Sequence, residues 1–180
     1  MPTVLPLISL VLAITVTPQN PTNTAPTAPP ADKRDVGSID AIIAALYDVI
    51  SGPANQHRNW ERMTSLFAPG ALMGAVFENR QKQLVHRSFS LPEYIRLSSP
   101  IMLKDGFFEH EIGRKTERFG NIAQVFSAYE SRFKKEDAKP FERGINSIQL
   151  AFDGTKWQVV SILWEGERPG LQIPREFLRK

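Results

Sequence analysis

Polar and apolar residues alternate through most of the second half of the chain. Four such segments follow one another: 107–119, 122–133, 143–152 and 157–165. Alternation with a period of two is typical of β-strands that bury one face. Asp153-Gly154 separates the last two segments and predicts a two-residue hairpin, because both residues tolerate a positive φ. We therefore expect four successive antiparallel strands.

The first half of the chain shows helical spacing instead. We expect three helices, each with a start and a stop signal: 39–50 between Ser38 and Gly52-Pro53, 60–67 between Asn59 and Pro69-Gly70, and 91–99 between Ser90 and Ser99-Pro100. The third begins with a capping box in which a proline lies in the first turn. Two shorter strands, 71–78 and 83–89, precede it.

Composition divides the chain into four parts. Residues 1–17 are a signal-like apolar segment, 18–34 a Pro- and Thr-rich disordered linker, 35–166 the folded domain and 167–180 a C-terminal tail. The apolar run 4–16 is too short to span a bilayer, and its length suits a secretory signal. We therefore expect an exported protein, periplasmic or extracellular. An uncleaved membrane tether and a cytoplasmic leader are the alternatives, since no basic residue precedes the run.

Charge and residue types narrow the partners. The formal net charge is only +3 and no polybasic tract occurs, so we expect no nucleic-acid binding, and no membrane contact beyond the N-terminal segment. Cysteine is absent, which excludes disulfides and thiolate metal sites. His57, His86 and His110 lie on different predicted elements and favour no metal site, and no motif indicates a cofactor.

The order of these elements resembles the nuclear transport factor 2-like superfamily, which includes ketosteroid isomerases and SnoaL-type cyclases. The resemblance covers about 35–165 and includes Leu66-Phe67-Ala68 and the segment Asp153–Val159. The runs Arg118–Arg132 and Arg143–Gln149 resemble a bacterial branch without an assigned activity. The resemblance implies an α+β fold, cone-shaped, with three N-terminal helices packed on a curved, mainly antiparallel six-stranded sheet.

The resemblance also implies where an isomerase would carry its catalytic groups. Its catalytic aspartate follows the Leu-Phe-Ala segment, and here that position is Ala75. A tyrosine on the first helix matches Tyr47, although the connection 52–59 is longer than in the isomerases. Steroid isomerisation is therefore not expected, while the cavity can persist.

Strand alternation selects the candidate pocket residues. In 107–119 the face with Phe108, His110 and Ile112 is expected to point inward, and Glu109 and Glu111 outward. The candidates for the pocket are His110, Tyr129, Arg143, Ser127 and Tyr47. His110 is either a general base or a hydrogen-bonded core histidine, and Tyr129 either a ligand donor or a rim residue. For Arg143, cross-strand pairing on the solvent face is the favoured alternative.

The last strand is apolar on both faces. Val160, Ile162 and Trp164 share the face expected to point away from the core, which indicates a homodimer interface. Three functions remain open: a domain that binds a small apolar or amphipathic molecule without catalysis, an isomerase, dehydratase or cyclase using His110 and Tyr129, and a pocketless dimerisation module.

Overall fold

The protein is described from a computed structural model, which covers residues 30–178. The signal-like segment and most of the linker lie outside the described residues. Within 30–178 the helices are α1 Lys33–Val36, α2 Ile39–Ile50, α3 Trp60–Leu66, α4 Leu91–Asp105 and the 3-10 helix η1 Arg175–Leu178. The strands are β1 Phe67–Glu78, β2 Leu84–Ser90, β3 Phe108–Phe119, β4 Ile122–Arg132, β5 Glu142–Phe152 and β6 Trp157–Gly166.

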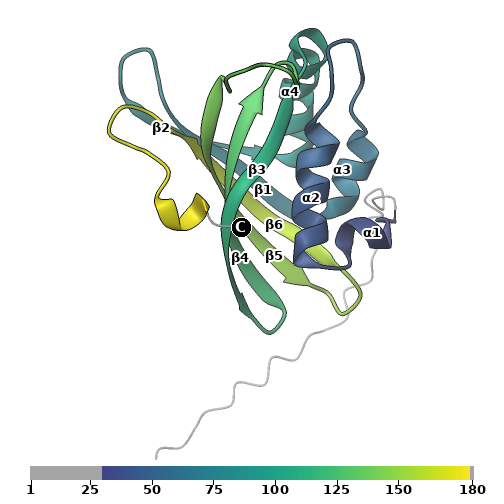
Figure 1. The fold of residues 1–180 in the computed structure, drawn as a ribbon. Coiled ribbons are helices and arrows are strands. Elements are labelled where there is room, and N and C mark those ends of the chain that lie inside the picture. Colours follow the sequence, from purple (N-terminus) through teal and green to yellow (C-terminus); the bar gives the residue numbers. More distant parts are fainter. Residues whose placement is uncertain (1–29, 179–180) are drawn as a thin grey trace, which may run out of the picture.

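The strands form one six-stranded sheet in the order β2-β1-β6-β5-β4-β3. The pairing of β1 with β6 is parallel, and the other four pairings are antiparallel. Helices α1, α2 and α3 lie on one face of this curved sheet, and η1 lies on the opposite face (Figure 1). The α+β class and the six strands are as predicted. The short α1 was not predicted, and it begins inside the range assigned to the linker.

The predicted helix starts are confirmed by their caps. The side chains of Ser38, Asn59 and Ser90 accept hydrogen bonds from backbone N–H groups of the first turns of α2, α3 and α4. The predicted end of α4 at Ser99-Pro100 is wrong, because the helix continues to Asp105. Proline removes one backbone donor, but the burial of Met102 and the cap at Gly106 hold the extra turn.

The predicted two-residue hairpin at Asp153-Gly154 is a four-residue loop. Phe152 pairs with Trp157, and only Gly154 has a positive φ (98°) among the loop residues. The Asp153 carboxylate accepts hydrogen bonds from the backbone N–H groups of Thr155 and Lys156 at 2.8 and 3.0 Å. The Thr155 hydroxyl also donates to this carboxylate, at 2.6 Å. The bond from this hydroxyl and then the two backbone bonds lower the pKa of Asp153, and together they stabilise the longer turn.

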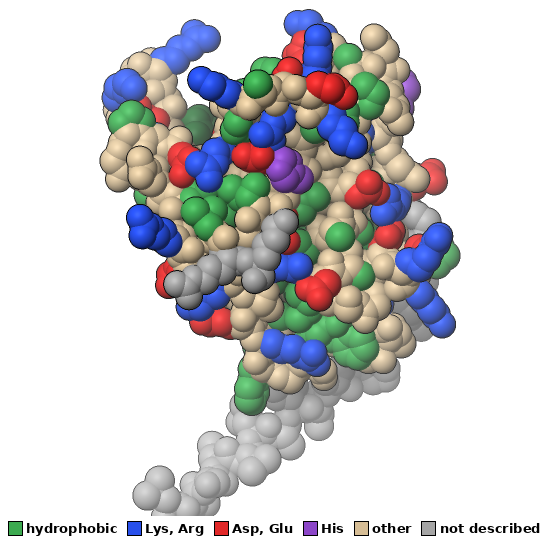
Figure 2. Space-filling model, viewed as in Figure 1, with side chains coloured by type: hydrophobic (Ala, Val, Ile, Leu, Met, Phe, Trp, Pro, Cys, Tyr) green, Lys and Arg blue, Asp and Glu red, His purple; other side chains and the backbone are tan. Residues whose placement is uncertain are grey.

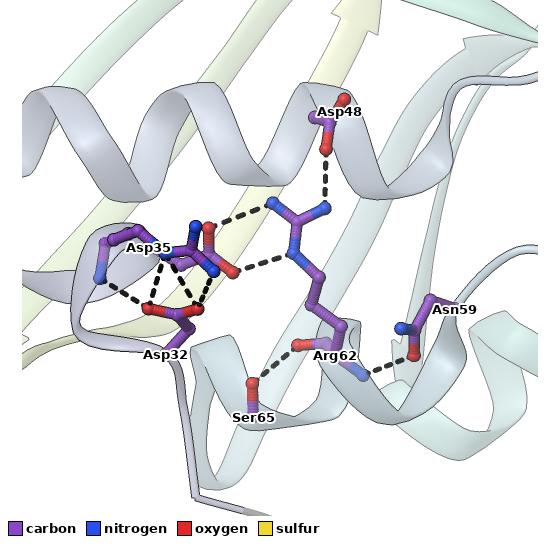
Figure 3. Close-up of polar contacts among 7 residues, drawn as sticks. Asp32, Asp35, Asp48, Asn59, Arg62 and Ser65 are labelled. Atoms are coloured by element: carbon purple, nitrogen blue, oxygen red, sulfur yellow. Dashed lines mark hydrogen bonds and ion pairs between the residues drawn. The ribbon is translucent and has the colours of Figure 1, made fainter.

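Arg62 joins helices α1, α2 and α3 (Figure 3). Its guanidinium on α3 donates to both carboxylate oxygens of Asp35 on α1, at 2.7 and 2.9 Å, and to Asp48 on α2, at 2.5 Å. The Asp35 side chain is only 14 % exposed, so its two-bond ion pair with Arg62 is partly shielded from water. The ion pairs hold the helix layer together at the edge of the core.

Two β-bulges change which side chains face the helices. In β3, Glu111 pairs with Tyr129 and Gly113 with Ala128, so Ile112 is an extra residue. In β6, Ser161 pairs with Gln149 and Val159 with Leu150, so Val160 is extra. Each bulge reverses the alternation of its strand and bends the sheet.

The C-terminal segment covers part of the sheet face opposite the helices. Phe177 of η1 stacks on Phe126 of β4, with ring centroids 5.3 Å apart. The η1 backbone at Phe177 and Leu178 also lies so close to Gly113 that a Cβ there would stand 2.5 Å from the Phe177 carbonyl oxygen. Phe126, on the outer face of β4, therefore has an aromatic partner within the same chain.

Candidate functional site

A pocket of about 260 Å³ lies between the helix layer and the sheet. Helices α2, α3 and α4 form one wall, and strands β1, β3, β4, β5 and β6 form the other. Most of the lining is apolar or aromatic: Leu46, Ile50, Met63, Met73, Tyr94, Ile101, Met102, Phe107, Ile148, Ile162 and Trp164. The polar groups come from Tyr47, Ser98, Glu109, Tyr129, Glu142 and Asn146. A concave apolar site with a few polar groups is typical of small-molecule pockets.

Glu109 on β3 is the central polar group of this pocket. Its carboxylate accepts hydrogen bonds from Ser131 Oγ at 2.7 Å and from Asn146 Nδ2 at 3.3 Å. Burial, and to a smaller extent the charge of Glu142, raise its pKa to about 7, against the two hydrogen bonds, which lower it. Ser51 Oγ holds its backbone, accepting from the Glu109 N–H at 3.0 Å. Glu109 can therefore exchange a proton near neutral pH.

A chain of hydrogen bonds leads from Glu109 away from the pocket. Asn146 Nδ2 donates to Tyr47 Oη at 3.2 Å, and Tyr47 Oη lies 2.6 Å from Ser127 Oγ. Ser127 donates to Glu111 at 2.6 Å, and Glu111 pairs with Arg114. Because the single hydroxyl proton of Ser127 goes to Glu111, the Tyr47 hydroxyl donates to Ser127. The Tyr47 phenol is thus directed away from the pocket, and burial raises its pKa.

A second carboxylate lies at the edge of the pocket. Tyr129 on β4 is 2 % exposed and donates to Glu142 on β5 at 3.3 Å. Burial raises the pKa of Glu142, and the hydrogen bond from Tyr129 opposes that rise. The pocket therefore contains two carboxyl groups whose ionised forms are both disfavoured by their surroundings.

Aromatic rings close the pocket on the side of β6 and α4. Trp164 stacks on Phe89 with ring centroids 6.1 Å apart and meets the edge of Tyr94 at 6.0 Å. Phe107, just before β3, lines the pocket, and its ring centroid lies 6.2 Å from that of Phe141. The pocket wall is therefore rich in π-faces.

The structure divides the predicted pocket residues into two groups. Tyr47 and Tyr129 line the pocket, and Ser127 lies behind Tyr47, fully buried. The inward placement of His110 is wrong: its side chain is 55 % exposed and lies 2.9 Å from Glu130 on the outer face. Arg143 also lies outside the pocket, and it pairs at 3.3 Å with Glu167, which follows β6.

The face assigned to a dimer interface is also corrected. Ile162 and Trp164 line the pocket, whereas Val160 is 42 % exposed on the other side of the sheet. The bulge at Val160 separates them, because it moves the even-numbered residues that follow to the helix side. In the view of Figure 2 acidic, basic and apolar side chains are interspersed over the surface.

Sequence reasoning missed Glu109, Glu142 and Asn146. Glu109 was assigned to the solvent because its neighbours Phe108 and His110 looked like the core face. A signal was present in β4, where Ser127, Tyr129 and Ser131 share an inward face. Directly opposite residues share a face, so Ser131 places Glu109 inward once the register is known.

Two negative findings concern residues 30–178. No group of three or more His, Asp or Glu side chains is arranged there to hold an ion. Among the helices of this part of the chain, none is long and apolar enough to cross a bilayer.

Solved structures share this fold at low sequence identity. One is the β subunit of a proposed aromatic-ring-hydroxylating dioxygenase from Novosphingobium aromaticivorans DSM 12444, with a TM-score of 0.56, 12 % identity and coverage of 79 % of this chain and 94 % of that one. A protein of unknown function with a cystatin-like fold, from Nostoc punctiforme PCC 73102, has a TM-score of 0.54 and 14 % sequence identity. The match covers 74 % of this chain and 92 % of that one. A proposed dehydratase of the NTF2-like family from Streptomyces avermitilis has a TM-score of 0.50 and 13 % sequence identity. The match covers 74 % of this chain and 96 % of that one.

These comparisons establish the class of fold. The chain has an NTF2-like fold, as its element order predicted. No family model matches the sequence, and no curated protein matches it either. Identities of 12–14 % show the fold alone, so the function rests on the pocket itself.

Proposed function

We propose that the protein binds a small, largely apolar molecule in the pocket between α2, α4 and the sheet. The observation that carries this proposal is the cavity of about 260 Å³ with an apolar wall and a polar end. The cavity that the NTF2-like resemblance implies supports the same proposal. Its volume suits a ligand of about ten non-hydrogen atoms, which would exchange ordered water for apolar contacts.

Three methionines make this proposal directly testable. The chain has four, and Met63, Met73 and Met102 all line the pocket from three different elements. In protein labelled with ¹³C at the methionine methyl groups, a bound aromatic ring should shift these three signals. A panel of one-ring and two-ring fragments, neutral and charged, is titrated into the labelled protein. If no fragment shifts any of the three signals at millimolar concentration, the proposal fails.

A matched pair of variants shows whether the fragments occupy the pocket. Ile162→Trp fills the pocket from β6, and binding should be lost. Val160→Trp adds the same ring two residues away on the exposed face, and binding should persist. Circular dichroism verifies that both variants are folded. Equal binding by the two variants would place the fragments elsewhere on the protein.

A second function is favoured by one observation, the carboxyl of Glu109 with a pKa of about 7 in an apolar pocket. Such a group is suited to general acid–base catalysis at neutral pH. Glu109 would then abstract a proton from carbon next to a carbonyl, as an isomerase or dehydratase does. His110 has no place in this reaction because it lies outside the pocket. Tyr129 remains available at the pocket wall.

Solvent exchange tests this second function without knowledge of the substrate. The protein is incubated with cyclic ketones and enones in D₂O, and deuterium incorporation next to the carbonyl is followed by NMR. Glu109→Gln should abolish any catalysed exchange, and His110→Ala should leave it unchanged. Exchange that survives Glu109→Gln would exclude Glu109 as the base. Export and homodimerisation remain predictions from the sequence.

A further inference from the structure

We propose that the ligand of this pocket is an amine that binds as its ammonium cation, with the ammonium group at Glu109 and the apolar part between the aromatic walls. This inference rests on the proposed binding function and specifies the chemical class of the ligand. It comes from the charges, the hydrogen-bond directions and the rings around one cavity.

The charges of the pocket are unbalanced. Two carboxyl groups, Glu109 and Glu142, line it, and among the lining residues no Lys, Arg or His faces them. The buried Arg58 is directed elsewhere, since its guanidinium donates to the backbone carbonyls of Ile50 and Gly52. Carboxylates in an apolar site normally have a counter-charge, and here the protein supplies none at the pocket. A cationic ligand would supply it.

Around Glu109 the polar groups that remain free to bind a ligand are hydrogen-bond acceptors, because the donors already have partners. The two amide hydrogens of Asn146 are committed to Tyr47 and to Glu109. The hydroxyl hydrogens of Tyr47 and Ser131 are committed to Ser127 and to Glu109. The Asn146 carbonyl oxygen and the remaining lone pairs of Glu109 can still accept. A ligand that brings N–H donors therefore fits this end, and a carboxylate does not.

The other groups that face Glu109 favour the same chemistry. Tyr129 donates to Glu142 and so presents an electron-rich ring and a filled hydroxyl. Tyr94 from α4 and Trp164 from β6 add π-faces at the opposite wall. Aromatic faces attract organic ammonium ions, most strongly where water is excluded. The hydroxyl of Ser98 adapts as donor or acceptor and does not oppose a cation.

Three probes of one shape test this inference. 2-Phenylethylammonium, propylbenzene and 3-phenylpropanoate share a phenyl ring and a short chain and differ in charge. Binding is measured at pH 8 through the methyl signals of Met63, Met73 and Met102. We expect the ammonium probe to bind about tenfold or more tightly than propylbenzene, and the anion to bind most weakly. Glu109→Gln should remove most of the preference, whereas Glu117→Gln, exposed on the same strand, should retain it.

The pH dependence supplies a second readout. Since the pKa of Glu109 is about 7, its ionised fraction falls about tenfold between pH 8 and pH 6. The affinity for 2-phenylethylammonium should fall by about the same factor, and the affinity for propylbenzene should not. In Glu109→Gln this dependence should be lost.

The outcomes separate the two proposals. Equal affinity for the ammonium and propylbenzene, or tightest binding of the anion, overturns the ammonium inference and leaves the binding function standing. A preference for the ammonium that survives Glu109→Gln also overturns it. If none of the three probes shifts the methionine signals, and the wider fragment panel does not either, the binding function itself fails.

Discussion

Replacing Glu109 with glutamine is expected to stabilise the protein, and to do so at high pH rather than low pH. In the folded protein the pKa of Glu109 is about 7, against 4.5 for an ordinary glutamate. The folded state therefore holds this proton more tightly than the unfolded state. The stability associated with it is present below about pH 4.5 and is lost as the pH rises through 7.

The size of the effect follows from the two pKa values. Their difference corresponds to about 3 kcal/mol of destabilisation at high pH, of which about 2.5 kcal/mol develops between pH 5 and pH 8. The carboxyl opens on the pocket, where water screens it, so we expect a realised difference of about 2 kcal/mol. Glutamine preserves the shape and can still accept the hydrogen bond from Ser131.

Urea denaturation of wild type and Glu109→Gln at pH 5, 6, 7 and 8 measures this difference. The variant should be close to wild type at pH 5 and about 2 kcal/mol more stable at pH 8. Comparison of the two proteins at each pH cancels the titration of all groups that do not contact Glu109, and Glu117→Gln serves as the exposed control. A stability difference that is the same at pH 5 and pH 8 would refute a desolvated Glu109.

Four further substitutions test the framework around the pocket. Arg62→Met should lower the free energy of unfolding, measured in urea, by about 1 to 2 kcal/mol, because it leaves the half-buried Asp35 unpaired. Asp48→Asn should lower it by less, because that carboxylate is exposed. Pro100→Ala should raise the melting temperature by a few degrees, since it restores a backbone donor inside α4, and an unchanged or lower value would contradict this. Phe177→Ala should cost about 1 kcal/mol and increase hydrogen exchange in β3 and β4, and unchanged exchange would show that the C-terminal segment does not protect the sheet.

Local signals in the sequence were sufficient for most of the fold. Ser38, Asn59 and Ser90 marked the helix starts because a cap depends on a few neighbouring residues. The alternation of polar and apolar residues also depends only on neighbouring positions, and it located all the strands. Pro100 misled because the packing of the turn beyond it outweighs one lost hydrogen bond.

The candidate site was less predictable, because it depends on contacts between distant segments. Tyr47 and Tyr129 were identified, and both line the pocket. Glu109 was placed on the wrong face because alternation shows two faces of a strand without showing which one the helices cover. The C-terminal segment covers the more apolar face of β3, a contact between residues more than 60 positions apart that no local pattern records.

The two bulges link the shape of the pocket to its chemistry. Ile112 and Val160 are surplus residues in strands on different sides of the sheet centre, and such residues increase the local bend of a strand. The same surplus residue determines whether the side chains on either side of it turn toward the helices. Deleting Ile112 would therefore reduce the bend while Glu111 and Gly113 kept their partners Tyr129 and Ala128, whereas deleting a paired residue of β3 would move the side chains beyond it to the other face. In this protein, the number of residues in a strand specifies the binding site as strictly as their identity does.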